Sequence, residues 1–146
     1  MDQLLWTIVA VASAIGLGAS LYVIRFTGLG PATPSSADAA CSLTDPGKCA
    51  TLFQLPTARL IKGIPNASLG LIFYTVTLVT AMASFAWSIP PIWVLLLLAG
   101  AIGACVMSVV LAYRLLFVLK VPCVACFIGH GSNLVLLGLL IRLRMG

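Results

Sequence analysis

Residues 63–113 carry no charged side chain over 51 positions: GIPNASLGLIFYTVTLVTAMASFAWSIPPIWVLLLLAGAIGACVMSVVLAY. A single helix of this length would measure about 75 Å, whereas the apolar core of a bilayer is about 30 Å thick. The chain must therefore fold back on itself within the stretch. The expected turn is Ser88-Ile-Pro-Pro91, because Pro91 can begin a helix but a Pro-Pro pair cannot lie inside one. This indicates two membrane spans, over about 67–88 and 91–116.

Two further apolar segments bring the count of spans to four. One covers about 4–26, where Leu4 to Ile24 is free of charge, and the other covers about 122–141. Hydrophobic residues make up 62% of the chain and charged residues 8%, which is typical of a polytopic membrane protein and not of a soluble domain. A signal peptide is not expected, because no basic residue precedes the first apolar run and the run is too long. We predict an all-α membrane protein, with one domain over 1–146 folded as a four-helix transmembrane bundle.

The topology brings the cysteines to one membrane face. An even number of spans places both termini on the same side. The long loop over 27–66 and the short link over 117–122 then share the opposite side. Four of the five cysteines belong to this loop or to the helix start directly after the link, namely Cys41, Cys49, Cys123 and Cys126. Two cysteine pairs are therefore expected to face each other.

The first pair is Cys123 and Cys126, in the motif Cys-Val-Ala-Cys that follows Pro122. Since proline suits the first turn of a helix, Cys123 is expected in that turn and Cys126 one turn further in. Unpaired N–H groups and the positive end of the helix dipole stabilise a thiolate there, and Lys120 adds charge nearby. The motif indicates a redox-active dithiol. A zinc site shared with the second pair, or a purely structural pair, is the alternative.

The second pair lies in the loop segment CSLTDPGKC, which begins at Cys41 and ends at Cys49. Asp45 followed by Pro46 is a helix-start signature, so a short helix beginning there would place Cys49 and Phe53 on one face. We expect this half-helix to lie on the membrane as a lid, with Cys49 directed toward the bundle. Cys41 would then stay exposed and meet a partner. A plain structural disulfide is the alternative.

A few polar or reactive side chains lie within the spans. Asn66 begins the second span, either as the N-cap of its helix or as a hydrogen-bond donor to a carbonyl group in the bundle. His130, the only histidine, lies one turn beyond Cys126 and is either functional or a packing residue. Asn133 is one turn deeper and is expected to bridge helices. Cys105, in mid-span, is expected to be a buried packing residue.

The order of these motifs resembles the vitamin K epoxide reductase family and its prokaryotic homologues. The likeness covers the chain from about Cys41 to Asn133. Other four-span quinone reductases that form disulfides have their two cysteine motifs in the reverse order. The segments that carry the resemblance are the Cys-x7-Cys of 41–49, NASLGLIFYT of 66–75, FVL of 117–119 and the CxxC of 123–126.

The resemblance implies a four-helix bundle around a quinone, of the menaquinone or ubiquinone type, with the loop half-helix as a lid. It implies that Cys41 exchanges with a thioredoxin-like partner and that Cys49 passes electrons to Cys123. Cys126 would deliver the electrons to the quinone. Asn66 would hydrogen-bond a quinone oxygen.

Further quinone contacts are expected for His130, Phe53, Leu69 and Phe73. His130 stands where vertebrate members have a tyrosine, which argues against assuming vitamin K epoxide as the substrate. Homologues outside animals use quinones to make disulfides, and some carry a fused thioredoxin-like domain that this chain lacks. The partner is therefore expected to be a separate protein. Neither a metal nor a nucleic acid is expected as a ligand.

The sequence thus predicts a quinone-dependent thiol–disulfide oxidoreductase that oxidises a thioredoxin-like partner and supports protein disulfide formation. A non-enzymatic four-helix membrane scaffold with structural disulfides is the alternative. A small transporter is disfavoured, because transporters carry buried charges or broken helices in their spans, and these spans offer only His130.

Basic residues are concentrated on the cysteine-bearing side of the predicted topology. Because basic residues in short loops favour the cytoplasmic side, their distribution predicts that the cysteine loop faces the cytoplasm. The family resemblance implies the extracytoplasmic side instead, so both orientations stay open. The two sets are Arg25, Lys48, Arg59, Lys62, Arg114 and Lys120 on the cysteine side, and Arg142 and Arg144 on the side of the termini.

Overall fold

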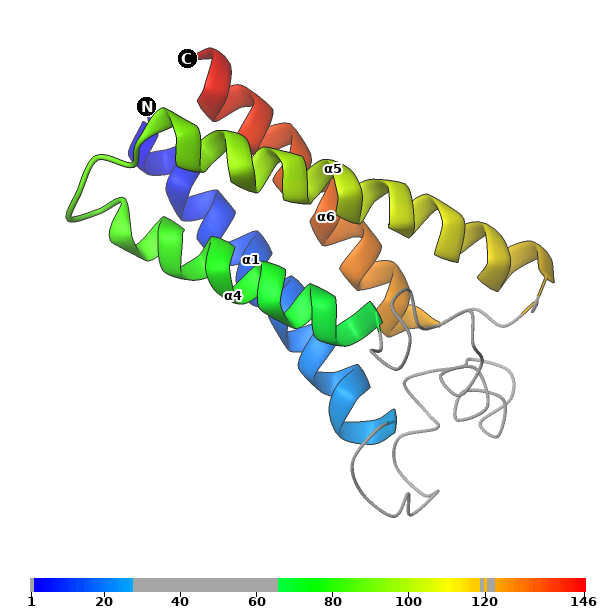
Figure 1. Ribbon diagram of the computed structural model, residues 1–146. Coiled ribbons are helices and arrows are strands. Elements are labelled where there is room, and N and C mark those ends of the chain that lie inside the picture. The colour runs from blue at the N-terminus through cyan, green and yellow to red at the C-terminus, as the bar shows by residue number, and fades with distance from the viewer. Residues whose placement is uncertain (1, 28–65, 119, 121–122) are drawn as a thin grey trace.

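The computed structural model describes residues 2–27, 66–118, 120 and 123–146. They form the helices α1 (Asp2–Thr27), α4 (Asn66–Ala83), α5 (Pro91–Tyr113) and α6 (Val124–Met145), and a π-helical turn, η2 (Arg114–Val118), continues α5 (Figure 1). The described part of the chain contains no strand. Among the described residues, four helices, counting α5 and η2 as one, are long and apolar enough to cross a bilayer. The predicted all-α, four-span membrane fold is confirmed, while the half-helix expected in the loop lies outside the described residues.

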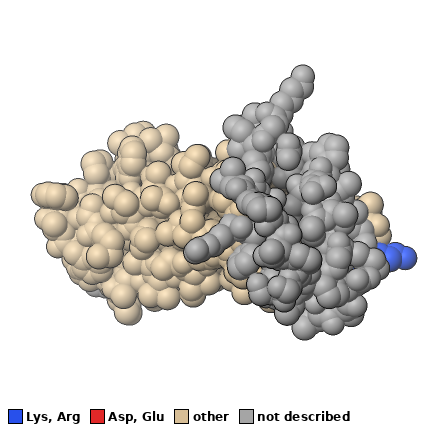
Figure 2. Space-filling view, turned by 90° about the horizontal axis from the view of Figure 1, so that it is seen from below, with Lys and Arg blue, Asp and Glu red and all other residues tan. Residues whose placement is uncertain are grey.

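The outer surface of the bundle is apolar. Large hydrophobic side chains point outward from every helix, among them Val11, Ile72, Val109 and Leu134. In Figure 2 the described surface shows charge only at one edge. In water such a surface would be an aggregation hazard, whereas in a bilayer it faces lipid chains of the same polarity. This is the surface of a multi-pass membrane protein.

The helices are not packed equally against one another. α1 packs along both α4 and α6, and α6 also packs along α5, whereas α4 and α5 hardly touch. Both chain termini lie at one end of the bundle, and the start of α6 lies at the other end, together with the end of α5 and the start of α4 (Figure 1). The expectation that the termini share one side is therefore confirmed.

The connection between α4 and α5 is a tight turn. α4 ends at Ala83, before the expected end of the second span at 88, because the next residues wind more tightly: the N–H of Phe85 reaches back three residues to the carbonyl of Met82 at 3.3 Å. Pro90 is extended (φ −61°, ψ 141°), and Pro91 is the first residue of α5. The proline pair thus ends the turn and begins the helix, as expected.

Two glycines allow aromatic residues of α4 to lie against neighbouring helices. A side chain at Gly16 of α1 would collide with the ring of Tyr74. A Cβ at Gly100 of α5 would lie 3.1 Å from Cε2 of Phe73. Small residues permit close approach of helices in lipid, where packing rather than the hydrophobic effect holds a bundle together. Tyr74 is consequently buried between helices, and Phe73 spans part of the space between α4 and α5.

Candidate functional site

Cys123 is the N-cap of α6 and not, as expected, a residue of its first turn. Its backbone is extended (φ −102°, ψ 107°), and its Sγ accepts a hydrogen bond from the backbone N–H of Cys126 at 3.4 Å. The helix begins one residue later, at Val124, because the sulfur itself supplies the acceptor that the first N–H groups of a helix lack. The positive end of the helix dipole favours negative charge at this position. The geometry therefore suits a thiolate at Cys123.

The ends of the other helices surround the two cysteines. Cys123 is completely buried, and Cys126 is half-buried beside it. Cys123 belongs to a cluster with Val23 of α1 and Leu115 of η2, against which Cys126 and Ala67 of α4 also pack. Apolar side chains from three elements thus hold the start of α6 in place and keep the sulfur of Cys123 from water.

Three of the predicted quinone contacts lie along α4. The helix begins at Asn66, whose side-chain nitrogen Nδ2 is buried. Leu69 and Phe73 follow at intervals of about one turn, so the three lie toward the same side of the helix. Since Ala67 packs against the cluster of Cys123, Asn66 lies at the cysteine end of the bundle. The structure therefore brings Asn66 and the dithiol to the same end.

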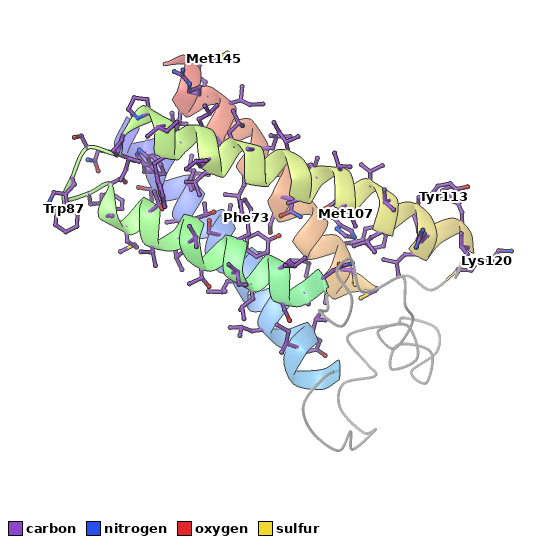
Figure 3. The ribbon with its side chains drawn as sticks, viewed as in Figure 1. Phe73, Trp87, Met107, Tyr113, Lys120 and Met145 are labelled. Atoms are coloured by element: carbon purple, nitrogen blue, oxygen red, sulfur yellow. The ribbon has the colours of Figure 1, made fainter. Side chains whose placement is uncertain are left out.

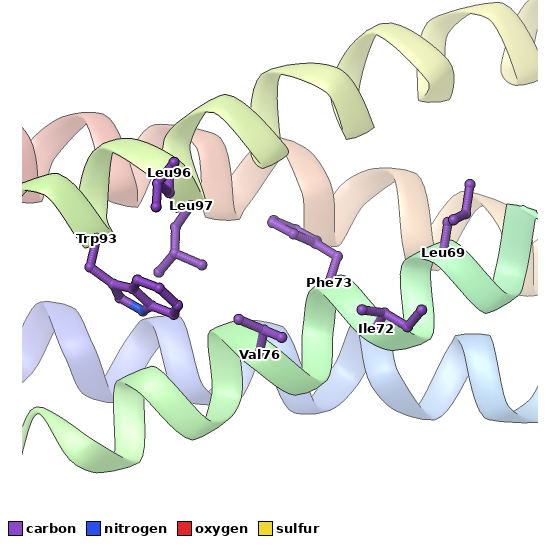
Figure 4. A pocket seen from close by; sticks show the side chains of 7 residues that line it. All are labelled: Leu69, Ile72, Phe73, Val76, Trp93, Leu96 and Leu97. Carbon is purple, nitrogen blue, oxygen red and sulfur yellow. The ribbon is translucent and has the colours of Figure 1, made fainter.

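An apolar groove of about 330 Å³ separates α4 from α5. Phe73 lies on the side of α4 that faces α5 (Figure 3), and Leu69 and Trp93 mark opposite ends of the groove (Figure 4). At the far end from Asn66, Nε1 of Trp93 donates to Oγ1 of Thr80 at 2.9 Å and ties the two helices together. The groove is open to the outside of the bundle, and its surface is almost entirely apolar. Its lining residues are Leu69, Ile72, Phe73, Val76, Trp93, Leu96 and Leu97.

His130 lies one turn beyond Cys126 on α6 and is half-buried. Its ring stands edge-on to Phe127, with centroids 6.0 Å apart and planes at 90°, and it lies within electrostatic range of Cys123. Its Nε2 is buried and has no hydrogen-bond partner among the described residues. A buried polar atom without a partner costs free energy. The imidazole is therefore positioned to pair with a polar group of a bound molecule, as donor or as acceptor according to its tautomer.

A polar network links three helices next to this site. The hydroxyl of Tyr74 lies 2.8 Å from the carbonyl oxygen of Gly129 and 2.7 Å from Oδ1 of Asn133. Nδ2 of Asn133 donates to Oγ of Ser108 at 2.9 Å. The expected bridging role of Asn133 is confirmed, and α4, α5 and α6 all take part.

Tyr74 is the residue of this region for which the sequence predicted no role. The signal that could have found it is a phenol within a span, because a buried hydroxyl in an apolar setting needs a partner. Its acceptor Gly129 directly precedes His130. Tyr74 therefore fixes the turn of α6 that carries His130 against α4.

Part of the predicted site lies outside the described residues, namely Cys41, Cys49 and Phe53. The contact expected between the two cysteine pairs, and the zinc alternative that needs both, therefore stay predictions. Among the described residues no group of three or more His, Cys, Asp or Glu could hold a metal ion. Cys105 is buried in α5, as expected for a packing residue.

A cysteine pair at a helix start, with Cys123 buried, in a four-span bundle that also has an apolar groove between α4 and α5, is a combination suited to redox chemistry in the membrane. The sequence model of the vitamin K epoxide reductase family matches residues 7–141, which extend from the first span to the last and include the loop and both cysteine motifs. Membership implies oxidoreductase activity in the membrane. The chain therefore belongs to the vitamin K epoxide reductase family.

Proposed function

We propose that this protein is a quinone-dependent thiol oxidase that takes electrons from a thioredoxin-like protein and passes them through two cysteine pairs to a membrane quinone. The observation that carries the proposal is the position of the CxxC pair. Cys123 caps α6 and Cys126 follows in its first turn, at the end of the bundle where α4 begins (Figure 1). A structural disulfide requires neither the groove between α4 and α5 nor the buried Nε2 of His130, which has no hydrogen-bond partner in the described part of the chain.

The residues near the dithiol fit a quinone. The groove between α4 and α5 offers an isoprenoid chain an apolar bed that opens to the lipid. Leu69, at the end of the groove opposite Trp93, follows Asn66 by about one helical turn. There the amide of Asn66 can donate to one ring oxygen, and Nε2 of His130, buried and without a partner in the described part of the chain, can pair with another. A bound quinone supplies an acceptor for two electrons and two protons.

The cysteines carry the electrons by thiol–disulfide exchange. A dithiol of the partner reduces the Cys41–Cys49 disulfide and is itself oxidised to a disulfide. The thiolate of Cys49 then attacks Cys123 of the Cys123–Cys126 disulfide, forming a Cys49–Cys123 bond and releasing Cys126 as a thiolate. Attack of Cys41 on Cys49 restores the loop disulfide and leaves Cys123 and Cys126 as a dithiol. Oxidation of that dithiol to a disulfide returns two electrons and two protons to the acceptor.

The position of Cys123 supports this order of exchange. The N-cap hydrogen bond from Cys126 N–H and the helix dipole both stabilise negative charge on the Cys123 sulfur. Cys123 is therefore the sulfur suited to exchange with the loop. Cys126, released as a thiolate, lies one turn before His130 on α6.

The proposal is tested with the purified protein alone. The protein is reduced, freed of reductant and mixed with menaquinone or ubiquinone analogues while the quinone absorbance is followed. Two quinones should be reduced per fully reduced protein, one by the CxxC dithiol and one by the electrons that the loop dithiol passes on to it. A reduced thioredoxin-like substrate should then sustain turnover. Unchanged absorbance with every quinone would contradict the proposal and favour the non-enzymatic scaffold.

A further inference from the structure

The rod formed by α5 and η2 is longer than the apolar core of a bilayer. It runs from Pro91 to Val118, which is 28 residues and therefore about 42 Å. The core measures about 30 Å. Part of the rod must consequently lie among the lipid headgroups, unless it is strongly tilted.

Aromatic side chains mark two levels along this rod. Trp93 is 43% exposed near its start, and Trp87 is 73% exposed in the preceding turn. Near the other end, Tyr113 and Phe117 are 59% and 66% exposed, and their rings stack at 5.1 Å and 30°. Trp93 and Tyr113 lie about 30 Å apart along the helix, which is the thickness of the core. Because Trp and Tyr concentrate at both interfaces, the stack of Tyr113 and Phe117 marks the interface on the cysteine side.

Two cations lie at and beyond this level. Arg114 and Lys120 are exposed, and Figure 3 shows Lys120 at the extreme tip of the rod, close to Tyr113 and at the opposite end from Trp87. Arg114 is the first residue of the π-helical turn Arg114–Val118. Such turns are rare and often mark functional positions. The rod ends at Val118, and Lys120, two residues further on, has a left-handed backbone, with φ 53°. The cations therefore lie at the depth of the lipid phosphates.

No acidic side chain in the described part of the chain neutralises this tip. The whole sequence contains three acidic residues, Asp2, Asp38 and Asp45. Asp2 begins α1 at the opposite end of the bundle (Figure 1), and the other two lie outside the described residues. Within the described part of the chain, Arg114 and Lys120 are therefore exposed cations with no acidic side chain to offset their charge.

We propose that the tip of α5, formed by Tyr113, Arg114, Phe117 and Lys120, is a binding surface for an anionic phospholipid. The guanidinium of Arg114 and the ammonium of Lys120 complement the headgroup phosphate and its net negative charge. The stacked rings provide an amphipathic surface at the level where the acyl chains join the headgroup. A zwitterionic lipid shares the phosphate but not the net charge, so it binds more weakly. The proposal does not depend on the redox function.

Photo-crosslinking in nanodiscs tests this surface. Full-length protein is labelled with photoactivatable phosphatidylglycerol or with the matching phosphatidylcholine, and crosslinks are mapped by mass spectrometry. We expect phosphatidylglycerol to label residues 113–120 in preference to phosphatidylcholine. Replacing Arg114→Gln or Lys120→Gln should reduce that labelling by about fivefold each. The charge-conserving pair Arg114→Lys and Lys120→Arg should retain most of it.

Cations at the opposite end of the bundle provide the matched control. Arg142→Gln with Arg144→Gln removes two of them and should leave labelling of 113–120 unchanged. All the replaced side chains are exposed, so folding is expected to be preserved, as circular dichroism can verify. Equal labelling by the two lipids, full labelling in the double variant Arg114→Gln with Lys120→Gln, or loss of labelling to an excess of soluble glycerol phosphate would overturn the assignment to an anionic lipid.

Discussion

The hydroxyl of Tyr74 on α4 lies 2.7 Å from Oδ1 of Asn133 on α6 and 2.8 Å from the carbonyl oxygen of Gly129. This contact sets the register between the helix that begins at Asn66 and the turn that carries His130. The two residues proposed to hold a quinone ring therefore stand on helices that one phenol ties together. The same hydroxyl has a single proton for two acceptors, so its loss would change both contacts.

Replacing Tyr74→Phe should disturb quinone binding more than it disturbs the fold. The ring, which fills the space against Gly16, is kept, while the hydroxyl bond between helices is lost at a cost of about 1 kcal/mol. We expect a small loss of thermal stability and a several-fold rise in the KM for quinone, with thiol exchange at Cys123 unchanged. Stability in detergent and quinone kinetics measure the two effects.

Thr77→Val is the matched control for this prediction. Thr77 is also completely buried in α4, but its hydroxyl donates to the carbonyl of Phe73 in its own helix at 2.8 Å. Its removal should leave the KM for quinone as it is. If Tyr74→Phe and Thr77→Val give the same KM, the contact from Tyr74 to α6 plays no part in positioning the site.

A disulfide between Cys49 and Cys123 should be trappable when Cys41 and Cys126 are replaced by serine. Exchange needs direct attack of a thiolate on a sulfur, so the proposed relay requires these two sulfurs to meet. Peptide mass spectrometry without reduction should find the linked pair. The converse variant, in which Cys49 and Cys123 are replaced by serine, should form little disulfide between Cys41 and Cys126. Absence of a Cys49–Cys123 peptide would show that the relay order is wrong.

Asn66→Ala and His130→Ala should weaken quinone binding more than folding. Loss of a hydrogen bond to a buried carbonyl costs on the order of 1 kcal/mol, which is about fivefold in Kd. If Asn66 acts only as a helix cap, its replacement should instead lower the melting temperature and leave the quinone Kd unchanged. Measuring both quantities for each variant separates the two roles. An unchanged Kd in both variants would remove these residues from the site.

The span pattern could be predicted from the sequence because it depends on local properties. The uncharged stretch around Pro90 and Pro91 requires a turn whatever the helices touch, and a CxxC after proline predicts a helix start. The role of Tyr74 could not be predicted in this way. It depends on Gly129 and Asn133, which lie 55 and 59 residues further along the chain, and no periodicity within one helix identifies such a pairing.

Helix ends were less predictable than helices, for a similar reason. Cys123 was expected inside the first turn, but its sulfur accepts from the N–H of Cys126 and becomes the cap instead. A side chain that can end a helix or lie within it leaves the boundary to tertiary packing. Here the burial of Cys123 against Val23 and Leu115 accompanies the capped arrangement.

The end of the bundle that carries the cysteine loop and the CxxC pair is predicted to lie on the cytoplasmic side of the membrane. Most of the basic residues lie at this end of the bundle in the predicted topology, and an excess of Lys and Arg in short loops favours the cytoplasmic side. A membrane-impermeant maleimide, applied after mild reduction, should label Cys41 in lysed cells but not in intact cells. Cys105, buried in mid-span, should stay unlabelled in both. Labelling of Cys41 in intact cells would place this end of the bundle outside the cytoplasm, as the family resemblance implies.

Delivery of electrons from Cys126 to a quinone can be measured in a single turnover with matched variants. Reduced wild-type protein, Cys126→Ser and Cys105→Ser are each mixed with excess quinone, and the reduced quinone is counted per protein. Cys105→Ser makes the same atomic change at a buried cysteine outside the CxxC pair. We expect the wild-type yield for Cys105→Ser and no quinone reduction by Cys126→Ser, with both variants folded. A full yield from Cys126→Ser would contradict this role of Cys126.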